Sequence, residues 1–271
     1  MRISVIQMNV TSEPAENLIH AGQLVRQAKQ AGADMVILPE MFVCTYENAS
    51  FLAHAEPVQG RIWQTLSRMA AENEIYLVGG SFPELEGERL YNTCFVFGPD
   101  GAQIARHRKA HLFDISVEGG QCFRESDTFS PGNDITLFPT KFGLMGLCIC
   151  FDFRFPELSR LMALEGAKVL LVPAAFNMTT GPLHWELLFR SRAVDNQVFT
   201  VGCAPARDEN GPYVSYGNSI IADPWGKVLC RADGAETILT ADLDLEEIDR
   251  VRQQLPLMSA RRTDLYRLQR R

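Results

Sequence analysis

Residues 143–158 read GLMGLCICFDFRFPEL, and the change of character within this stretch decides how the fold is interpreted. An apolar segment carries Cys148 and Cys150 and then turns polar at Asp152 and Arg154. A buried strand accommodates cysteine as a small hydrophobic side chain, but it has no use for Asp and Arg unless the strand ends before them. The segment is therefore either a core strand with a solvated end or a strand that presents a nucleophile at its tip.

The length and composition of the chain indicate an ordinary globular protein. Of its 271 residues, 46% are hydrophobic and 22% are charged, and a chain of this size can bury most of its apolar surface in one core. We therefore expect one domain, residues 1–271. The net charge of −7 argues against a nucleic-acid partner, and we expect the basic segment 261–271 to be solvated.

Cysteine usage and hydropathy indicate the compartment. The seven cysteines are irregularly spaced and form no CxxC pair, which argues against a structural metal site. The opening MRISVIQMNV has no long apolar run of the kind found in signal peptides. The longest apolar runs, such as 169–176, are too short to cross a bilayer. We expect a cytoplasmic protein with reduced thiols and no membrane partner.

The hydrophobic periodicity predicts sheets covered by helices. In the first part of the chain, strand-like runs alternate with helical patterns, a rhythm typical of parallel strands with helical crossovers. A hairpin follows, and then a long segment, 111–134, whose weak periodicity is typical of a functional loop. The predicted helices cover 17–31, 60–73, 156–167 and 183–197, and the predicted strands include 3–10, 34–40, 75–82, 91–98, 102–107 and 143–150.

Three polar or nucleophilic residues stand at the ends of predicted strands. Glu40 follows MVILP, Lys109 follows the strand at 102–107, and Cys150 ends GLMGLCIC. Ligands in open α/β sheets gather beyond the carboxyl ends of strands, so the three side chains could converge as base, cation and nucleophile. Taken singly, each is equally an exposed charge or a core thiol.

Three motifs resemble the signature of the nitrilase superfamily of carbon–nitrogen hydrolases: LPEMF (38–42), RKAHLFD (108–114) and CFDFRFPEL (150–158). The resemblance covers nearly the whole chain, because 215–229 and 252–266 also match. It implies an α/β fold, the four-layer αββα sandwich of that superfamily, often assembled as a homodimer or higher homo-oligomer. The periodicity alone does not distinguish such a sandwich from a single doubly wound sheet.

The resemblance also implies a Glu–Lys–Cys triad of Glu40, Lys109 and Cys150, with no metal and no organic cofactor. Glu40 would act as general base, and Lys109 with the backbone N–H of Phe151 would stabilise the oxyanion on the way to a thioester. Glu125, in FRES, resembles a second carboxylate that supports Lys109 and Glu40; its alternative is an ordinary loop charge.

Period-two alternation along the strand predicts Cys148 and Cys150 on the same side, with Cys150 at the tip and Cys148 one pleat deeper in the core.

The stretch 176–199, with 111–117 and 204–208, resembles the omega-amidase branch. That branch hydrolyses the terminal amide of α-keto dicarboxylic acid monoamides such as α-ketoglutaramate and α-ketosuccinamate. An amidase of deaminated glutathione, a nitrilase or aliphatic amidase, and a non-enzymatic interaction protein are the alternatives.

The expected substrate carries a carboxylate, which calls for a fixed cation. Arg154 is the candidate, because a guanidinium binds a carboxylate through two parallel hydrogen bonds. Its alternative is a structural ion pair with a carboxylate such as Glu157. Phe176 and Thr180, close to a strand end, are further candidate substrate contacts.

Overall fold

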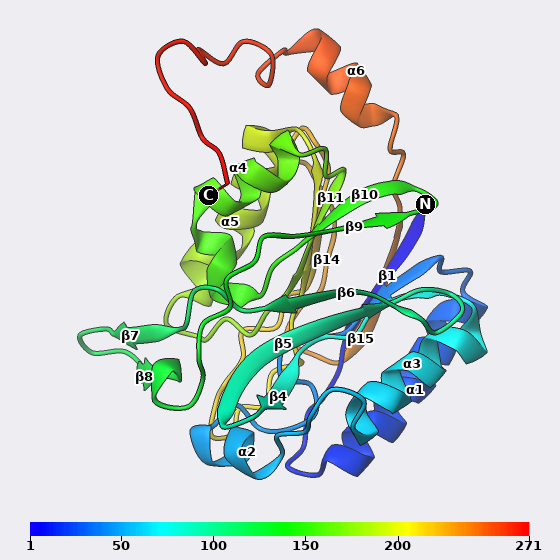
Figure 1. The fold of residues 1–271 in the computed structure, drawn as a ribbon, viewed down its shortest axis with the longest axis vertical. Helices are drawn as coiled ribbons and strands as arrows, with labels where there is room; N and C mark the ends of the chain where they lie inside the picture. The colour runs from blue at the N-terminus through cyan, green and yellow to red at the C-terminus, as the bar shows by residue number, and fades with distance from the viewer. Residues whose placement is uncertain (271) are drawn as a thin grey trace.

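The computed structural model describes residues 1–270, so that only Arg271 of the expected domain lies outside the described residues. Two sheets are stacked face to face, and a pair of helices covers the outer side of each (Figure 1). The first sheet has the order β15 (Thr237–Asp242), β1 (Arg2–Gln7), β2 (Met35–Ile37), β3 (Tyr76–Val78), β5 (Arg89–Phe97) and β4 (Phe82–Glu86), with β6 (Gln103–Arg108) also paired to β5. The second has the order β14 (Val228–Arg231), β13 (Ile220–Ala222), β12 (Phe199–Cys203), β11 (Val169–Pro173), β10 (Gly143–Leu147) and β9 (Thr136–Thr140).

The helices divide between the two outer faces. On the first sheet lie α1 (Pro14–Gln30) and α3 (Arg61–Asn73), and on the second lie α4 (Pro156–Leu164) and α5 (Gly181–Asn196). The smaller elements are α2 (Asn48–Ala53), α6 (Glu247–Gln254), the hairpin of β7 (Asp114–Ser116) and β8 (Cys122–Arg124), and the 3₁₀ turns η1 (Glu125–Asp127) and η2 (Cys150–Arg154). No helix within residues 1–270 is both long and apolar enough to cross a membrane.

Strand β5 shows why the sheets stack. Cys94 and Val96 belong to the core that also holds residues of the second sheet, whereas Phe95 and Phe97 belong to the core under α1 and α3. Successive side chains of a strand point to opposite faces, so a strand that is apolar at every position must be covered on both sides. One face is covered by helices and the other by the second sheet, which confirms the expected αββα arrangement.

Both sheets have a parallel centre, and this positions the site. Strands β1, β2 and β3 run parallel to one another in the first sheet, as do β10, β11 and β12 in the second. Glu40 follows β2, Cys150 follows β10 and Phe176 follows β11. The residues that follow parallel strands gather at the carboxyl edge of each sheet, where ligands bind in α/β folds.

Two local predictions were wrong. Strand β10 ends at Leu147, and Cys150 begins η2, so the alternation that placed Cys148 and Cys150 on one side does not extend to Cys150. The segment 111–134 is not structureless, because it forms the β7–β8 hairpin and η1.

Candidate active site

A tight turn after β2 places Glu40. The backbone N–H of Ser81 donates to the carbonyl of Pro39 at 3.2 Å, and Gly80 lies between the two segments with a φ of +61°. A Cβ atom at Gly80 would come within 2.3 Å of the Pro39 carbonyl oxygen, so only glycine permits this approach. The result is a carboxylate that is buried at the edge of the sheet.

Lys109 extends β6 by one residue and turns its ammonium towards two carboxylates. Its Nζ lies 2.8 Å from Glu40 Oε1 and 2.8 Å from Glu125 Oε2, and all three side chains are fully buried. The backbone N–H of Lys109 donates to the carbonyl of Asn92 at 2.9 Å, which fixes the start of the side chain. The sequence-predicted Glu40, Lys109 and Glu125 are thus brought together.

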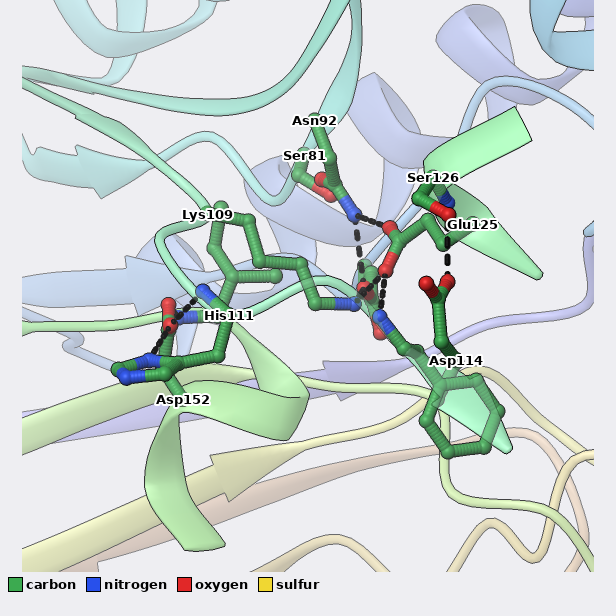
Figure 2. Close-up of polar contacts among 12 residues, drawn as sticks. Ser81, Asn92, Lys109, His111, Asp114, Glu125, Ser126 and Asp152 are labelled. Carbon is green, nitrogen blue, oxygen red and sulfur yellow. Dashed lines mark hydrogen bonds and ion pairs between the residues drawn. The ribbon is translucent and has the colours of Figure 1, made fainter. Parts of the chain in front are cut away.

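Asn92 completes this group, which we call the acid–base cluster (Glu40, Asn92, Lys109 and Glu125). Its side-chain amide donates to Glu40 Oε1 at 2.8 Å and to Glu125 Oε1 at 2.9 Å (Figure 2). Glu125 also accepts the backbone N–H of Phe113 at 2.6 Å, which ties η1 to the hairpin. Glu125 is therefore a member of a buried network and not an ordinary loop charge.

Cys150 sits in a strained turn. Its φ is +47°, a left-handed conformation that a non-glycine residue adopts at a cost of about 1–3 kcal/mol unless its surroundings enforce it. The thiol is buried, and the Phe151 amide follows it in the first turn of η2. Cys148 is completely buried in the inter-sheet core, as expected for a structural thiol.

The cluster sets the protonation of its members. Burial disfavours the charge of Lys109, but Glu125 and Glu40 outweigh it and raise the pKa of Lys109, so the amine stays an ammonium. Burial and the neighbouring Glu40 raise the pKa of Cys150 well above its usual value, while Lys109 opposes this shift. Burial and Glu40 also raise the pKa of Glu125, against the pull of Lys109. At neutral pH the resting thiol is therefore protonated and needs a base.

Glu40 has a free oxygen for that task. Its Oε1 atom accepts from Asn92 and Lys109, with the Tyr46 hydroxyl at 3.4 Å, whereas its buried Oε2 atom has no hydrogen-bond partner among the described residues. A cavity of ≈ 50 Å³ reaches Glu40 and is walled by Tyr46, Ala175 and Tyr213. That volume exceeds the roughly 10–15 Å³ that one water molecule requires.

The remaining sequence candidates form a second group, which we call the arginine pocket (Arg154, Phe176, Thr180 and His184). Arg154 donates to His184 Nδ1 at 3.0 Å and to Thr180 Oγ1 at 2.9 Å, and its Cζ atom lies 4.4 Å from the centre of the Phe176 ring. The half-buried guanidinium has no carboxylate partner within residues 1–270; Glu157, the alternative partner, is exposed and does not pair with it.

Sequence reasoning missed Asn92, Tyr46 and His184. Asn92 carried a signal, because an amide inside the apolar strand YNTCFVFG must find partners when it is buried. Tyr46 and His184 carried none that separates them from ordinary core or surface residues. Within residues 1–270, no group of three or more His, Cys, Asp or Glu side chains is arranged to hold a metal ion.

Comparisons with known proteins agree with this geometry. The carbon–nitrogen hydrolase family model matches residues 2–253. Over 265 residues the chain is 49% identical to the omega-amidase NIT2 of Mus musculus, which covers 98% of this chain and 96% of the mouse protein. The crystal structure of Saccharomyces cerevisiae Nit3, a member of branch 10 of the nitrilase superfamily, superimposes with a TM-score of 0.90 at 40% identity, covering 97% of this chain and 96% of Nit3.

A more distant solved structure concerns the nucleophile. The amidase from Nesterenkonia sp. AN1, 26% identical with a TM-score of 0.78, covers 94% of this chain and 98% of its own, and was solved with acrylamide added to its active-site cysteine. The match over most of the chain, together with the buried Glu, Lys and Cys at the sheet edge, shows that this protein belongs to the carbon–nitrogen hydrolase family.

Proposed function

We propose that this protein is an omega-amidase, which converts an α-keto dicarboxylic acid monoamide to the dicarboxylic acid and ammonia through a thioester on Cys150. The curated relatives named omega-amidase NIT2 support the activity. The cysteine adduct of the Nesterenkonia amidase supports a cysteine nucleophile in this fold. The reaction needs no metal and no organic cofactor, since the acid–base cluster supplies a base, a cation and hydrogen-bond donors.

In the first half-reaction, Glu40 removes the thiol proton as the Cys150 sulfur attacks the amide carbon. The amide oxygen becomes an oxyanion, which accepts hydrogen bonds from the Lys109 ammonium and the Phe151 N–H. Glu40 then passes its proton to the amide nitrogen, the carbon–nitrogen bond breaks, and ammonia leaves. Because the resting thiol has a raised pKa, this general-base step is essential rather than auxiliary.

In the second half-reaction, water enters beside Glu40. Glu40 takes a proton from the water, which attacks the thioester carbon, and the same two donors stabilise the second oxyanion. The carbon–sulfur bond breaks, and the proton held by Glu40 returns to the sulfur, so that thiol and base are restored. Glu125 and Asn92 keep Lys109 and Glu40 in place through both steps, and Glu125 is thus a supporting residue.

The unpaired Arg154 carries the choice of substrate. A guanidinium that is half-buried without a carboxylate partner is poised to bind one, since a charged group buried unpaired is costly. Thr180 and His184 hold it in one orientation, and Phe176 covers its face. We propose that Arg154, Phe176 and Thr180 contact the carboxylate end of the substrate while the amide end meets Cys150.

Ammonia release from a panel of amides tests this function. The expected order is α-ketoglutaramate and succinamate far above butyramide, which lacks the carboxylate. A deaminated-glutathione amide hydrolysed faster than succinamate would favour the sister amidase, and preference for a nitrile would favour a nitrilase. An interaction protein would release no ammonia from any of them.

A second copy of this chain is the partner we propose. Helix α5 exposes Leu183 and Leu187, which are 74% and 62% exposed, and Trp225 beside its far end is 47% exposed. Three large apolar side chains around one helix are the kind of surface that a homodimer buries. Light scattering should give twice the chain mass, and Leu187→Asp should shift the protein towards the monomer; a wild type that is monomeric at micromolar concentration would contradict the assignment.

We also propose a cytoplasmic location. All seven cysteines are free thiols, five of them buried, an arrangement suited to a reducing compartment. Cell fractionation with a tagged full chain would test it, and recovery in a secreted or membrane fraction would contradict it.

A further inference from the structure

The buried carboxylate of Asp152 receives an unusual number of hydrogen bonds. Its Oδ1 atom accepts from the backbone N–H groups of Ala110 and His111, at 3.1 and 2.8 Å, and from His111 Nδ1 at 2.8 Å. Its Oδ2 atom accepts from His107 Nε2 at 2.9 Å and from the backbone N–H of Ile149 at 3.1 Å. Two oxygen atoms thus connect two segments that lie about forty residues apart in the chain.

The first segment is the strained turn that carries Cys150. The Ile149 N–H donates to the Asp152 carboxylate, and the Asp152 N–H donates back to the Ile149 carbonyl at 3.0 Å. These two bonds close a ring around Cys150 and hold its left-handed φ of +47°. Without the carboxylate, one of the two bonds is lost, and the turn can relax towards an ordinary conformation.

The second segment is the end of β6 that carries Lys109. His107, Ala110 and His111, which all bind Asp152, bracket Lys109 on both sides. Figure 2 shows Asp152 and His111 on one side of Lys109, with Asn92 and Glu125 on the other. Asp152 therefore fixes the backbone from which the ammonium extends, while the acid–base cluster fixes its tip.

The protonation of this group follows from its contacts. Burial alone would raise the pKa of Asp152, but hydrogen bonds from His107 and His111 lower it below its usual value. An ionised carboxylate only accepts hydrogen bonds, so His107 Nε2 and His111 Nδ1 carry the donating protons. An amide in its place would turn an NH₂ group towards N–H donors on one side or the other.

We propose that Asp152 is a positioning residue, whose carboxylate sets the distance between Cys150 and Lys109 by holding both of their backbone segments at once. The inference rests on the proposed function, in which both residues act on the same oxyanion. Asp152 does not touch the substrate in this account. It acts through the turn at Cys150 and through the end of β6.

Asp152→Asn tests the proposal through kcat and KM measured separately. Displacing a reacting group by about 1 Å costs roughly 10²-fold in rate, so we expect kcat for succinamate to fall about 100-fold while KM changes little. The matched control is Asp223→Asn, which removes a buried carboxylate that accepts two backbone N–H groups in the turn after β13. Equal losses of kcat in the two folded variants would overturn the proposal.

Iodoacetamide labelling supplies a readout that does not depend on turnover. In Asp152→Asn, we expect Cys150 to be alkylated with a changed rate and pH profile, whereas the exposed Cys122 is alkylated as in the wild type. Wild-type labelling of Cys150 in a folded Asp152→Asn protein would overturn the proposal. A wild type that labels at Cys150 but hydrolyses no amide would contradict the proposed function instead.

A pair of His111 variants decides the question if Asp152→Asn does not fold. His111→Asn keeps an N–H donor near the place of Nδ1, whereas His111→Phe keeps the ring stacked on Phe155, at 3.8 Å between ring centres, and loses the donor. The His111 side chain is 35% exposed, so both variants should fold. We expect His111→Phe to lose about 10-fold more kcat than His111→Asn; equal or reversed losses would show that the bond to Asp152 does not position Lys109.

Discussion

The acid–base cluster and the arginine pocket both influence Cys150, but they are built in opposite ways. In the cluster, the buried Lys109 ammonium already has two carboxylate partners at 2.8 Å. In the pocket, the half-buried Arg154 has only the neutral acceptors of Thr180 and His184. Groups that do chemistry need a geometry fixed before the substrate arrives, whereas a group that selects the substrate leaves its charge for the substrate to neutralise.

Removing the nucleophile should give the largest effect on the cluster side. Cys150→Ala is expected to lower kcat by at least about 10⁴-fold, because neither half-reaction can proceed without the sulfur. The fold should survive, since the change removes one sulfur atom at the edge of the core. Ammonia release and circular dichroism measured together check both expectations.

Cys148→Ala is the control for that variant. Cys148 lies in the inter-sheet core, so its removal should lower the free energy of unfolding and leave turnover intact. An inactive Cys148→Ala beside an active Cys150→Ala would reverse the assignment of the nucleophile.

Lys109→Arg should give the next largest effect, although the charge is retained. The site holds a compact ammonium between Glu40 and Glu125, and a planar guanidinium is larger and donates in a fixed fork. We expect kcat to fall by about 10²–10³-fold, the size seen when one oxyanion donor is lost. Near-normal turnover in this variant would mean that Lys109 supplies only diffuse positive charge.

Arg154→Met tests the opposite side of the comparison. The variant should lower kcat/KM for succinamate by about 10- to 100-fold, the range expected when a hydrogen bond to a charged group is removed. The rate with butyramide should change little, because that substrate has no carboxylate to bind. Parallel losses for both amides would place Arg154 in the structural frame rather than in substrate selection.

The contrast between the two groups also shows what the sequence could predict. Glu40, Lys109 and Cys150 each follow a strand in a recognisable motif, so their convergence was expected from strand ends. The carboxylate-free surroundings of Arg154 were not predictable, because they depend on where α5 places His184 and Thr180 relative to η2. Glu157, near in sequence, turned out to be far less relevant than these distant residues.

Tertiary geometry also explains the fold features that were missed. The stacking of two sheets could not be read from β5, because apolar residues on both faces indicate only that both faces are covered. Helix α6 escaped notice since it buries little more than Ile248 and Val251, too short an apolar stripe to stand out. The link from Asp152 to His107 joins residues 45 positions apart, and no local pattern signals such a contact.

The smallest effect we predict compares two thiols, one at each side of the site. Cys44 lines the cavity next to Glu40 and is buried, and burial raises its pKa to about 12. Cys122 is exposed on the hairpin whose Gln121 contacts Asn177, beside the arginine pocket. Above pH 9 the unfolded chain releases the Cys44 proton while the folded chain keeps it, so the stability that this thiol contributes is complete below pH 9 and is lost as the pH rises towards 12. Cys44→Ala should therefore lose less unfolding free energy than the wild type between pH 8 and pH 10, by on the order of 1 kcal/mol, whereas Cys122→Ala should match the wild type. Urea unfolding of the three proteins at both pH values measures the difference, and identical alkaline losses in all three would show that Cys44 is not buried as a neutral thiol.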